Sequence, residues 1–192
     1  MLTSHCINQP KWLQDGSGGA FYFYRAYATI TNSYFIKNSA SYEGGVFQAY
    51  AGSWIVLNGN YFEGNSADKG GALYVADSTV FANCNTFKDN KALDGNGGAI
   101  IAYWPHLELS YNTFVGNHAT DLGGAVYMYD QTMNSLKNLY DTNDALSGGA
   151  VYVKTSTAVH SNADVFTENV ATDDVSMMMS KNLGFVSLVG HC

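Results

Sequence analysis

Acidic side chains recur along this 192-residue chain at nearly constant spacing, and their chemistry is the easiest to interpret. They follow one another at intervals of 25, 26 and 27 residues: Glu43, Asp68, Asp94 and Asp121. Calcium is bound by several carboxylate or carbonyl oxygens, so one carboxylate per interval is compatible with calcium sites along an edge. Turns also favour Asp because its side chain hydrogen-bonds to the local backbone. We favour a solvated, solubilising edge, with calcium binding as the alternative hypothesis; no other metal or cofactor is predicted.

The remaining polar residues do not indicate catalytic chemistry. Enzymes that cleave polysaccharides need carboxylates that converge on one face, and glycosidases use a pair about 5–9.5 Å apart. The chain has one arginine, Arg25, and its five histidines share no position in the repeat: His5, His106, His118, His160 and His191. No Ser/His/Asp arrangement can be identified. The sequence therefore predicts no catalytic residues, and not an enzyme.

Composition excludes several other classes of protein. The net charge is −7 and the nine basic residues are scattered, which argues against a nucleic-acid partner. Hydrophobic residues make up 46% and charged residues 13%, which is typical of a folded chain with one large core. No run approaches the roughly 18 apolar residues that span a bilayer, so no membrane-spanning segment is predicted. Residues 1–14 lack the organisation of a signal peptide, and we expect the chain to belong to a longer precursor.

The elements that position these residues are set by a repeated pair of glycines. The first glycines of the pairs are 26, 26, 27, 26 and 25 residues apart. The pairs are Gly18 and Gly19, Gly44 and Gly45, Gly70 and Gly71, Gly97 and Gly98, Gly123 and Gly124, and Gly148 and Gly149. Glycine reaches positive φ without steric cost and lets two backbones approach closely. Each pair is therefore predicted to form the same sharp corner in successive copies of the repeat.

An aromatic residue with Asn three positions later keeps the same period. The copies are Phe35 and Asn38, Phe62 and Asn65, Phe87 and Asn90, Phe114 and Asn117, Tyr140 and Asn143, and Phe166 and Asn169. We expect the aromatic rings to stack in the core and the Asn amides to form a ladder at a corner. Two independent markers in phase identify a repeat protein.

The segments between the markers are short runs of β-branched and aromatic residues, which predict strands. Three short strands per rung of about 26 residues are typical of an all-β parallel β-helix, in which equivalent strands pair from rung to rung. We expect residues 1–17 to form a degenerate N-terminal rung or cap, residues 18–175 to form six clear rungs, and residues 176–192 to form a degenerate C-terminal rung.

The alternation of Gly-Gly-Ala-[Ile/Leu/Val] with Phe-x-x-Asn resembles the polymorphic outer membrane protein (Pmp) repeat, known from chlamydial surface proteins and from proteins of protists. The resemblance covers residues 18–169. It implies a right-handed parallel β-helix at a cell surface that serves as an adhesin or scaffold rather than as an enzyme.

Tyrosines gather on one predicted strand face. Because side chains alternate along a strand, the second and fourth residues after each Gly-Gly-Ala should face outward. Eight of the 14 tyrosines fall there: Tyr22, Tyr24, Tyr50, Tyr74, Tyr103, Tyr127, Tyr129 and Tyr152. High β-propensity explains this pattern without any binding role. An exposed aromatic face would instead be a docking surface for a protein chain, and less readily for glycan rings.

The ends and the cysteines complete these expectations. Unpaired strand edges template association, so we expect both ends to stack on further rungs, of this or another chain. Cys6 and Cys192 should lie too far apart to form a disulfide; they are either unpaired or bonded to neighbouring segments. Cys84 has no counterpart in other repeats.

Together, the residues favour a structural or adhesive module of an extracellular or cell-surface assembly that contacts proteins through its Tyr face and open ends. The alternative is a module that binds or cleaves carbohydrate.

Overall fold

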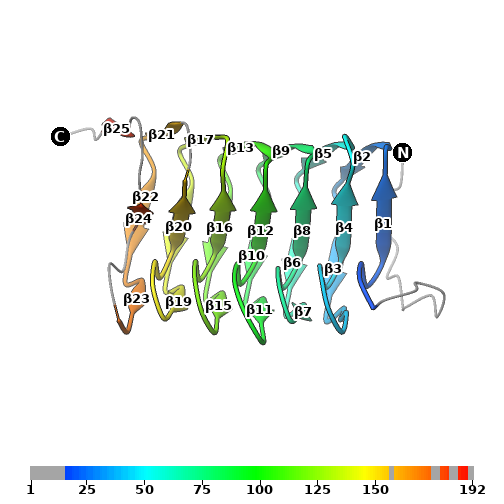
Figure 1. The fold of residues 1–192 in the computed structure, drawn as a ribbon, viewed down its shortest axis with the longest axis horizontal. Helices are drawn as coiled ribbons and strands as arrows, with labels where there is room; N and C mark the ends of the chain where they lie inside the picture. Colours follow the sequence, from blue (N-terminus) through cyan, green and yellow to red (C-terminus); the bar gives the residue numbers. More distant parts are fainter. Residues whose placement is uncertain (1–15, 156–157, 174–177, 182–185, 190–192) are drawn as a thin grey trace.

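The computed structural model describes residues 16–155, 158–173, 178–181 and 186–189, and all regular elements in these ranges are strands. The chain winds as a parallel β-solenoid in which each rung hydrogen-bonds to the next (Figure 1). The all-β fold and the repeat of about 26 residues per rung are confirmed, since partner residues such as Phe62, Phe87 and Phe114 lie in register in successive rungs.

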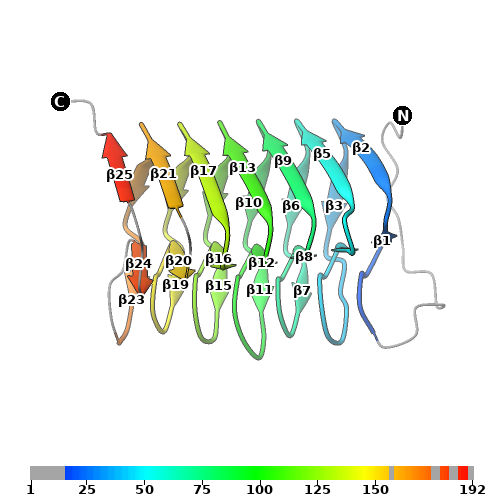
Figure 2. The ribbon, with the colours of Figure 1, turned by 45° about the horizontal axis from the view of Figure 1, so that its top comes forward.

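Two seven-stranded sheets form the longest faces of the solenoid. The first sheet contains β1 (Phe21–Tyr24), β4 (Phe47–Tyr50), β8 (Leu73–Ala76), β12 (Ile100–Tyr103), β16 (Val126–Tyr129), β20 (Val151–Lys154) and β24 (Met178–Lys181). The second sheet contains β2 (Tyr27–Thr31), β5 (Trp54–Asn58), β9 (Thr79–Asn83), β13 (His106–Ser110), β17 (Thr132–Leu136), β21 (Ala158–Asn162) and β25 (Val186–Val189). Figure 2, turned from Figure 1, brings the second sheet forward.

Two further sheets close the rungs. The third sheet contains β3 (Tyr34–Ile36), β6 (Tyr61–Glu63), β10 (Thr86–Lys88), β14 (Thr113–Val115), β18 (Leu139–Asp141) and β22 (Val165–Thr167). The fourth contains β7 (Ser66–Ala67), β11 (Lys91–Ala92), β15 (His118–Ala119), β19 (Asp144–Ala145) and β23 (Val170–Ala171). The prediction of three strands per rung therefore missed one: the two residues after each ladder Asn pair as a fourth short strand, which is too short to show an alternating pattern.

The aromatic residues of the repeat form a continuous stack inside the third sheet. Adjacent ring centroids are 4.7–4.9 Å apart from Phe35 through Phe62, Phe87, Phe114 and Tyr140 to Phe166. In the fifth copy of the motif, Tyr140 stands in place of Phe. The hydroxyl oxygen of Tyr140 lies 3.3 Å from Oγ of Ser135, so the buried hydroxyl has a hydrogen-bond partner. The stack packs against apolar residues of the first and second sheets, including Leu73, Ile100 and Leu107, to form the main core.

Asn side chains form two ladders along the solenoid, and one of them was not predicted. In the inner ladder, each Nδ2 donates to the Oδ1 of the next Asn at 2.8–3.0 Å, from Asn38 through Asn65, Asn90, Asn117 and Asn143 to Asn169. The second ladder is formed by residues that stand two positions before the stacked aromatic residues. It runs from Asn60 through Asn85, Asn112 and Asn138 to Asp164. Its sequence signal is the Asn two positions before four of the six aromatics.

The two glycines of each pair serve different purposes. Gly97 has φ +68, a left-handed conformation that glycine adopts freely. Gly98 lies where a Cβ would collide with the backbone carbonyl oxygens of Gly124 and His118 in the next rung. The second glycine is therefore required by rung-to-rung stacking.

The predicted domain boundaries fall at the margins of the described residues. Strands β1 to β23 lie within residues 18–175, and β24 and β25 extend the first and second sheets. Cys6 and Cys192 lie outside the described residues, so the expectations for them stay predictions. Cys84 is exposed with a free thiol, at a corner with φ 54.

Candidate binding surface

The predicted Tyr face corresponds to the outward side of the first sheet. One column of partnered positions contains Tyr22, Gln48, Tyr74, Ile101, Tyr127 and Tyr152. The other column contains the partners Tyr24 and Tyr50, followed by Ala76, Tyr103, Tyr129 and Lys154, which are partnered in that order. Parallel, in-register pairing brings all eight predicted tyrosines onto one sheet.

The expectation that all eight tyrosines face solvent is wrong for Tyr74, Tyr127 and Tyr152, which are buried. They form a second apolar cluster outside the main core, together with Ile101 and with Leu122 from the segment before a Gly-Gly pair. That segment lies over the outer side of the sheet, which alternation along a strand cannot reveal. These three tyrosines are part of the scaffold.

A polar contact anchors the equivalent segment three rungs earlier, before Gly44. Nε2 of Gln48 donates a hydrogen bond to Oε2 of Glu43 at 2.6 Å. Burial raises the pKa of Glu43, although hydrogen bonding to Tyr74 and the charge of Lys69 act in the opposite direction. Burial also raises the pKa of Tyr74, and the Glu43 charge adds to this effect. Glu43 therefore fixes the segment onto the sheet.

The exposed aromatic residues gather in the first two rungs. Tyr24 is 52% exposed and Tyr50, its partner on β4, is 42% exposed. Around the corner on the second sheet, the partners Tyr27 and Trp54 are also exposed. We call Tyr22, Tyr24, Tyr27, Tyr50 and Trp54 the aromatic patch. Arg25 adds a cation beside it, with its guanidinium carbon 5.3 Å from the Tyr24 ring centre.

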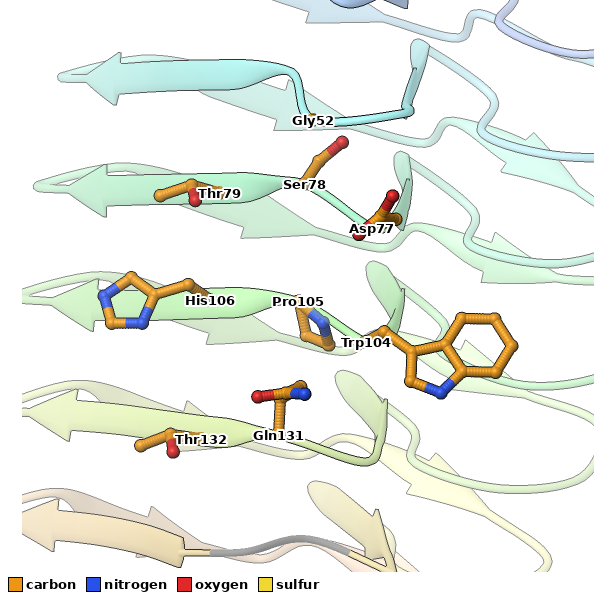
Figure 3. Close-up of a pocket in the computed structure, with 9 residues that line it drawn as sticks. All are labelled: Gly52, Asp77, Ser78, Thr79, Trp104, Pro105, His106, Gln131 and Thr132. Atoms are coloured by element: carbon orange, nitrogen blue, oxygen red, sulfur yellow. The ribbon is translucent and has the colours of Figure 1, made fainter.

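Farther along the first sheet, Tyr103 and Tyr129 are partly buried. Their ring centroids are 6.1 Å apart, and Trp104 packs edge-on against Tyr129 at 5.8 Å. Burial raises the pKa of Tyr103. Nζ of Lys154 lies 5.9 Å from the centre of the Tyr129 ring. This aromatic corner adjoins a hollow of about 360 Å³ between the first and second sheets, whose lining includes Asp77, Trp104 and Gln131 (Figure 3).

The repeat pattern of the sequence does not indicate this hollow. Its signal is a break in the repeat, since Trp104, Pro105 and His106 stand where the preceding rung has Asp77, Ser78 and Thr79. A search for recurring residues passes over a feature that occurs once.

The four acidic residues of the predicted edge differ in their surroundings. Glu43 is half-buried and accepts a hydrogen bond from Gln48, whereas Asp94 is exposed. Within the described ranges, no group of three or more His, Cys, Asp or Glu side chains is placed to hold a metal ion. Calcium binding by Glu43, Asp68, Asp94 and Asp121 stays a prediction.

These features define a class of protein: a parallel β-solenoid built from tandem repeats, with its variable residues on the outer faces. Residues 61–76, which include β6, β7 and β8, match the family model described as Chlamydia polymorphic membrane protein (Chlamydia_PMP) repeat. This match supports the identification as a Pmp-type repeat protein that the motifs predicted.

A curated relative extends the comparison. Metabotropic glutamate receptor-like protein R of Dictyostelium discoideum is 28% identical over 156 residues, which cover 79% of this chain and 10% of that protein. The chain thus spans about a tenth of the length of this relative. No solved structure matches the chain. Among the described residues, no helix is long and apolar enough to cross a membrane.

The repeat and the solenoid fit a structural β-helix module of the kind found in surface proteins. Pmp repeats are in general not enzymatic, which is consistent with the prediction that this chain has no catalytic activity.

Proposed function

We propose that this chain is a non-enzymatic, adhesive β-helix module of an extracellular or cell-surface assembly, and that it binds another protein chain through the aromatic patch. The observation that carries this proposal is the exposure of aromatic side chains on two adjoining sheets of the first two rungs. Tyr and Trp are enriched in protein interfaces because they offer a large apolar area together with a polar group.

The size of the aromatic patch supports a binding role. An aromatic side chain buries about 150–250 Å² when fully covered. With about half of that area accessible on each of five residues, covering the patch would bury roughly 400–600 Å², over half of the approximately 800 Å² per partner in a standard interface. The backbone beneath the patch is fixed by rung-to-rung hydrogen bonds, so little conformational entropy is lost on binding.

The open ends are a second contact route in this proposal. In the described part of the chain, β1 and β24 are the edge strands of the first sheet. Edge strands present unpaired backbone donors and acceptors, which further rungs of this or another chain can pair with. A surface location is supported by the family description, which names a membrane protein, and by the receptor-like name of the Dictyostelium relative.

The aromatic patch is tested with the double substitution Tyr24→Ser and Tyr50→Ser. The matched control is Tyr111→Ser, because Tyr111 is 50% exposed but lies outside the patch. Self-association is measured by sedimentation equilibrium, and adhesion by the binding of chain-coated beads to cultured cells before and after protease treatment. We expect the double variant to lose association or protease-sensitive adhesion while its melting temperature and that of the control stay close to the parent's.

Unchanged association and adhesion in the double variant would refute the proposal. Tyr127 and Tyr129 belong to the predicted Tyr face but are less suitable targets. Because Tyr127 is buried, a Ser there would remove core packing and lower the melting temperature whatever its effect on binding.

A further inference from the structure

The fourth rung departs from the repeat at the turn between β12 and β13. Trp104 has φ 48, the left-handed conformation that Asp77 also adopts at this corner of the preceding rung, so the departure lies in the residue types and not in the backbone. Pro105 follows it and is buried. In the rungs before it, the backbone N–H of Ser53 donates to Oγ of Ser78. Pro105 has no N–H with which to continue this series. A residue choice that breaks the pattern of an otherwise regular scaffold is typical of a functional position.

The turn borders the hollow of about 360 Å³, to which four consecutive rungs contribute. Figure 3 shows the Trp104 indole and the His106 imidazole extending in opposite directions from the turn, with the side chain of Gln131 directed toward Pro105. Trp104 is 52% exposed and belongs to the same aromatic corner as Tyr103 and Tyr129. The hollow thus has an aromatic border on the side of the first sheet.

Polar groups in the lining are available for a ligand. Within the part of the chain that the structure describes, the side chains of Asp77, Thr79 and Gln131 make no hydrogen bond, and Asp77 and Gln131 are exposed. They offer a carboxylate, a hydroxyl and an amide, hence both donors and acceptors. Nε2 of His106 lies 3.0 Å from Oε1 of Glu108, which orients the imidazole.

We propose that this hollow binds a neutral saccharide. A sugar ring has an apolar C–H face and a rim of hydroxyls, so it needs an aromatic surface beside groups that both donate and accept hydrogen bonds. Trp104 supplies the aromatic surface, and Asp77, Thr79 and Gln131 supply the polar groups. Sites for small ligands are usually concave and combine aromatic side chains with a few polar groups that fix the orientation of the ligand. The site is distinct from the aromatic patch of the first two rungs.

The charges favour a neutral ligand and binding without cleavage. Asp77 lines the hollow and Asp130 lies in the adjoining turn, on a chain with a net charge of −7, so uronic and sialic acids would be repelled. Asp77 is the single carboxylate among the residues that line the hollow. Glycosidases use two carboxylates, so the lining supports recognition rather than hydrolysis.

The experiment follows the indole Nε1–H signal of Trp104 in NMR spectra of the ¹⁵N-labelled chain. The probes are cellotetraose, chitotetraose and mannotetraose, with an oligogalacturonate as the charged comparison and a proline-rich decapeptide as the other ligand that aromatic corners bind. We expect at least one neutral oligosaccharide to shift the Trp104 signal to saturation. Trp104→Ala and Gln131→Ala, read from the backbone amides around the hollow, should each weaken binding by about tenfold or more.

The matched control is Tyr111→Ala, because Tyr111 is 50% exposed but neither lines the hollow nor belongs to the aromatic patch. It should bind as the parent does, and all three variants should keep the parent's melting temperature within a few degrees. The proposal is overturned if none of the neutral oligosaccharides shifts the Trp104 signal, if the charged oligosaccharide or the peptide binds as well as or better than they do, or if Tyr111→Ala weakens binding as much as Trp104→Ala.

Discussion

Replacing Asn90 with Ala tests whether the inner Asn ladder holds the rungs together. Asn90 is fully buried, and its side chain takes part in four hydrogen bonds. Nδ2 donates to Oδ1 of Asn117 at 3.0 Å and to the carbonyl oxygen of Phe62 at 3.1 Å. Oδ1 accepts from the backbone N–H of Asn65 at 3.1 Å and from its Nδ2 at 2.9 Å. Ala can make none of these bonds.

The four bonds do not contribute equally to the expected loss. The Nδ2 of Asn65 keeps its bond to the carbonyl oxygen of Phe35, and Oδ1 of Asn117 keeps its bond from the backbone N–H of residue 90. The backbone N–H of Asn65 loses its acceptor while buried, which costs about 1–3 kcal/mol. Three further bonds at about 0.5–1.5 kcal/mol each bring the total to about 2.5–7.5 kcal/mol. The loss in the free energy of unfolding should therefore exceed that of most single substitutions.

The assay is urea unfolding followed by circular dichroism, together with amide hydrogen exchange at Asn65. We expect a lower unfolding midpoint in Asn90→Ala and faster exchange of the Asn65 N–H, because that donor has lost its acceptor. Asn58→Ala is the control, since Asn58 is exposed and should change stability by less than about 0.5 kcal/mol. A loss below 1 kcal/mol in Asn90→Ala with unchanged exchange at Asn65 would refute the reasoning.

Three further predictions concern packing, backbone approach and pH. Phe87→Ala should lower the free energy of unfolding by about 3–5 kcal/mol, because the buried ring stacks on Phe62 and Phe114. A loss under 1 kcal/mol in urea unfolding would contradict this prediction. Gly98→Ala should be more destabilising than Gly52→Ala, because only the Cβ at position 98 would collide with the backbone. A Cβ at position 52 has open space, so Gly52→Ala should cost only about 1–2 kcal/mol for its left-handed backbone conformation. Equal melting temperatures of the two variants would disprove the backbone collision. Because the pKa of Glu43 is raised on folding, its contribution to stability falls as pH rises above its ordinary value of 4.5, and becomes constant above the folded pKa. Melts of the parent and Glu43→Gln across pH should therefore differ in slope in that window, and parallel curves would show that Glu43 is not perturbed.

Sequence alone determined the repeat and the residues of its core. The Gly-Gly pairs and the Phe-x-x-Asn motif recur in phase because each rung must place the same corner and the same ring above its predecessor. Side-chain alternation also identified which residues of the first sheet point toward the core. The fourth strand of each rung escaped prediction because two residues are too few to show a period. The second ladder carried a weaker signal than the first, because Asn stands two positions before four of the six aromatic residues but three positions after all six.

Tertiary structure decided which outward residues are accessible. Tyr22 and Tyr127 occupy the same column on the outward side of the first sheet, yet Tyr22 is exposed and Tyr127 is buried. The difference arises because Leu122, from the segment before a Gly-Gly pair, packs on the cluster that contains Tyr127. The hollow beside Trp104 likewise depends on side chains from four rungs that lie far apart in sequence. Periodicity specifies the direction of a side chain from its own backbone, whereas exposure depends on what other segments place over it.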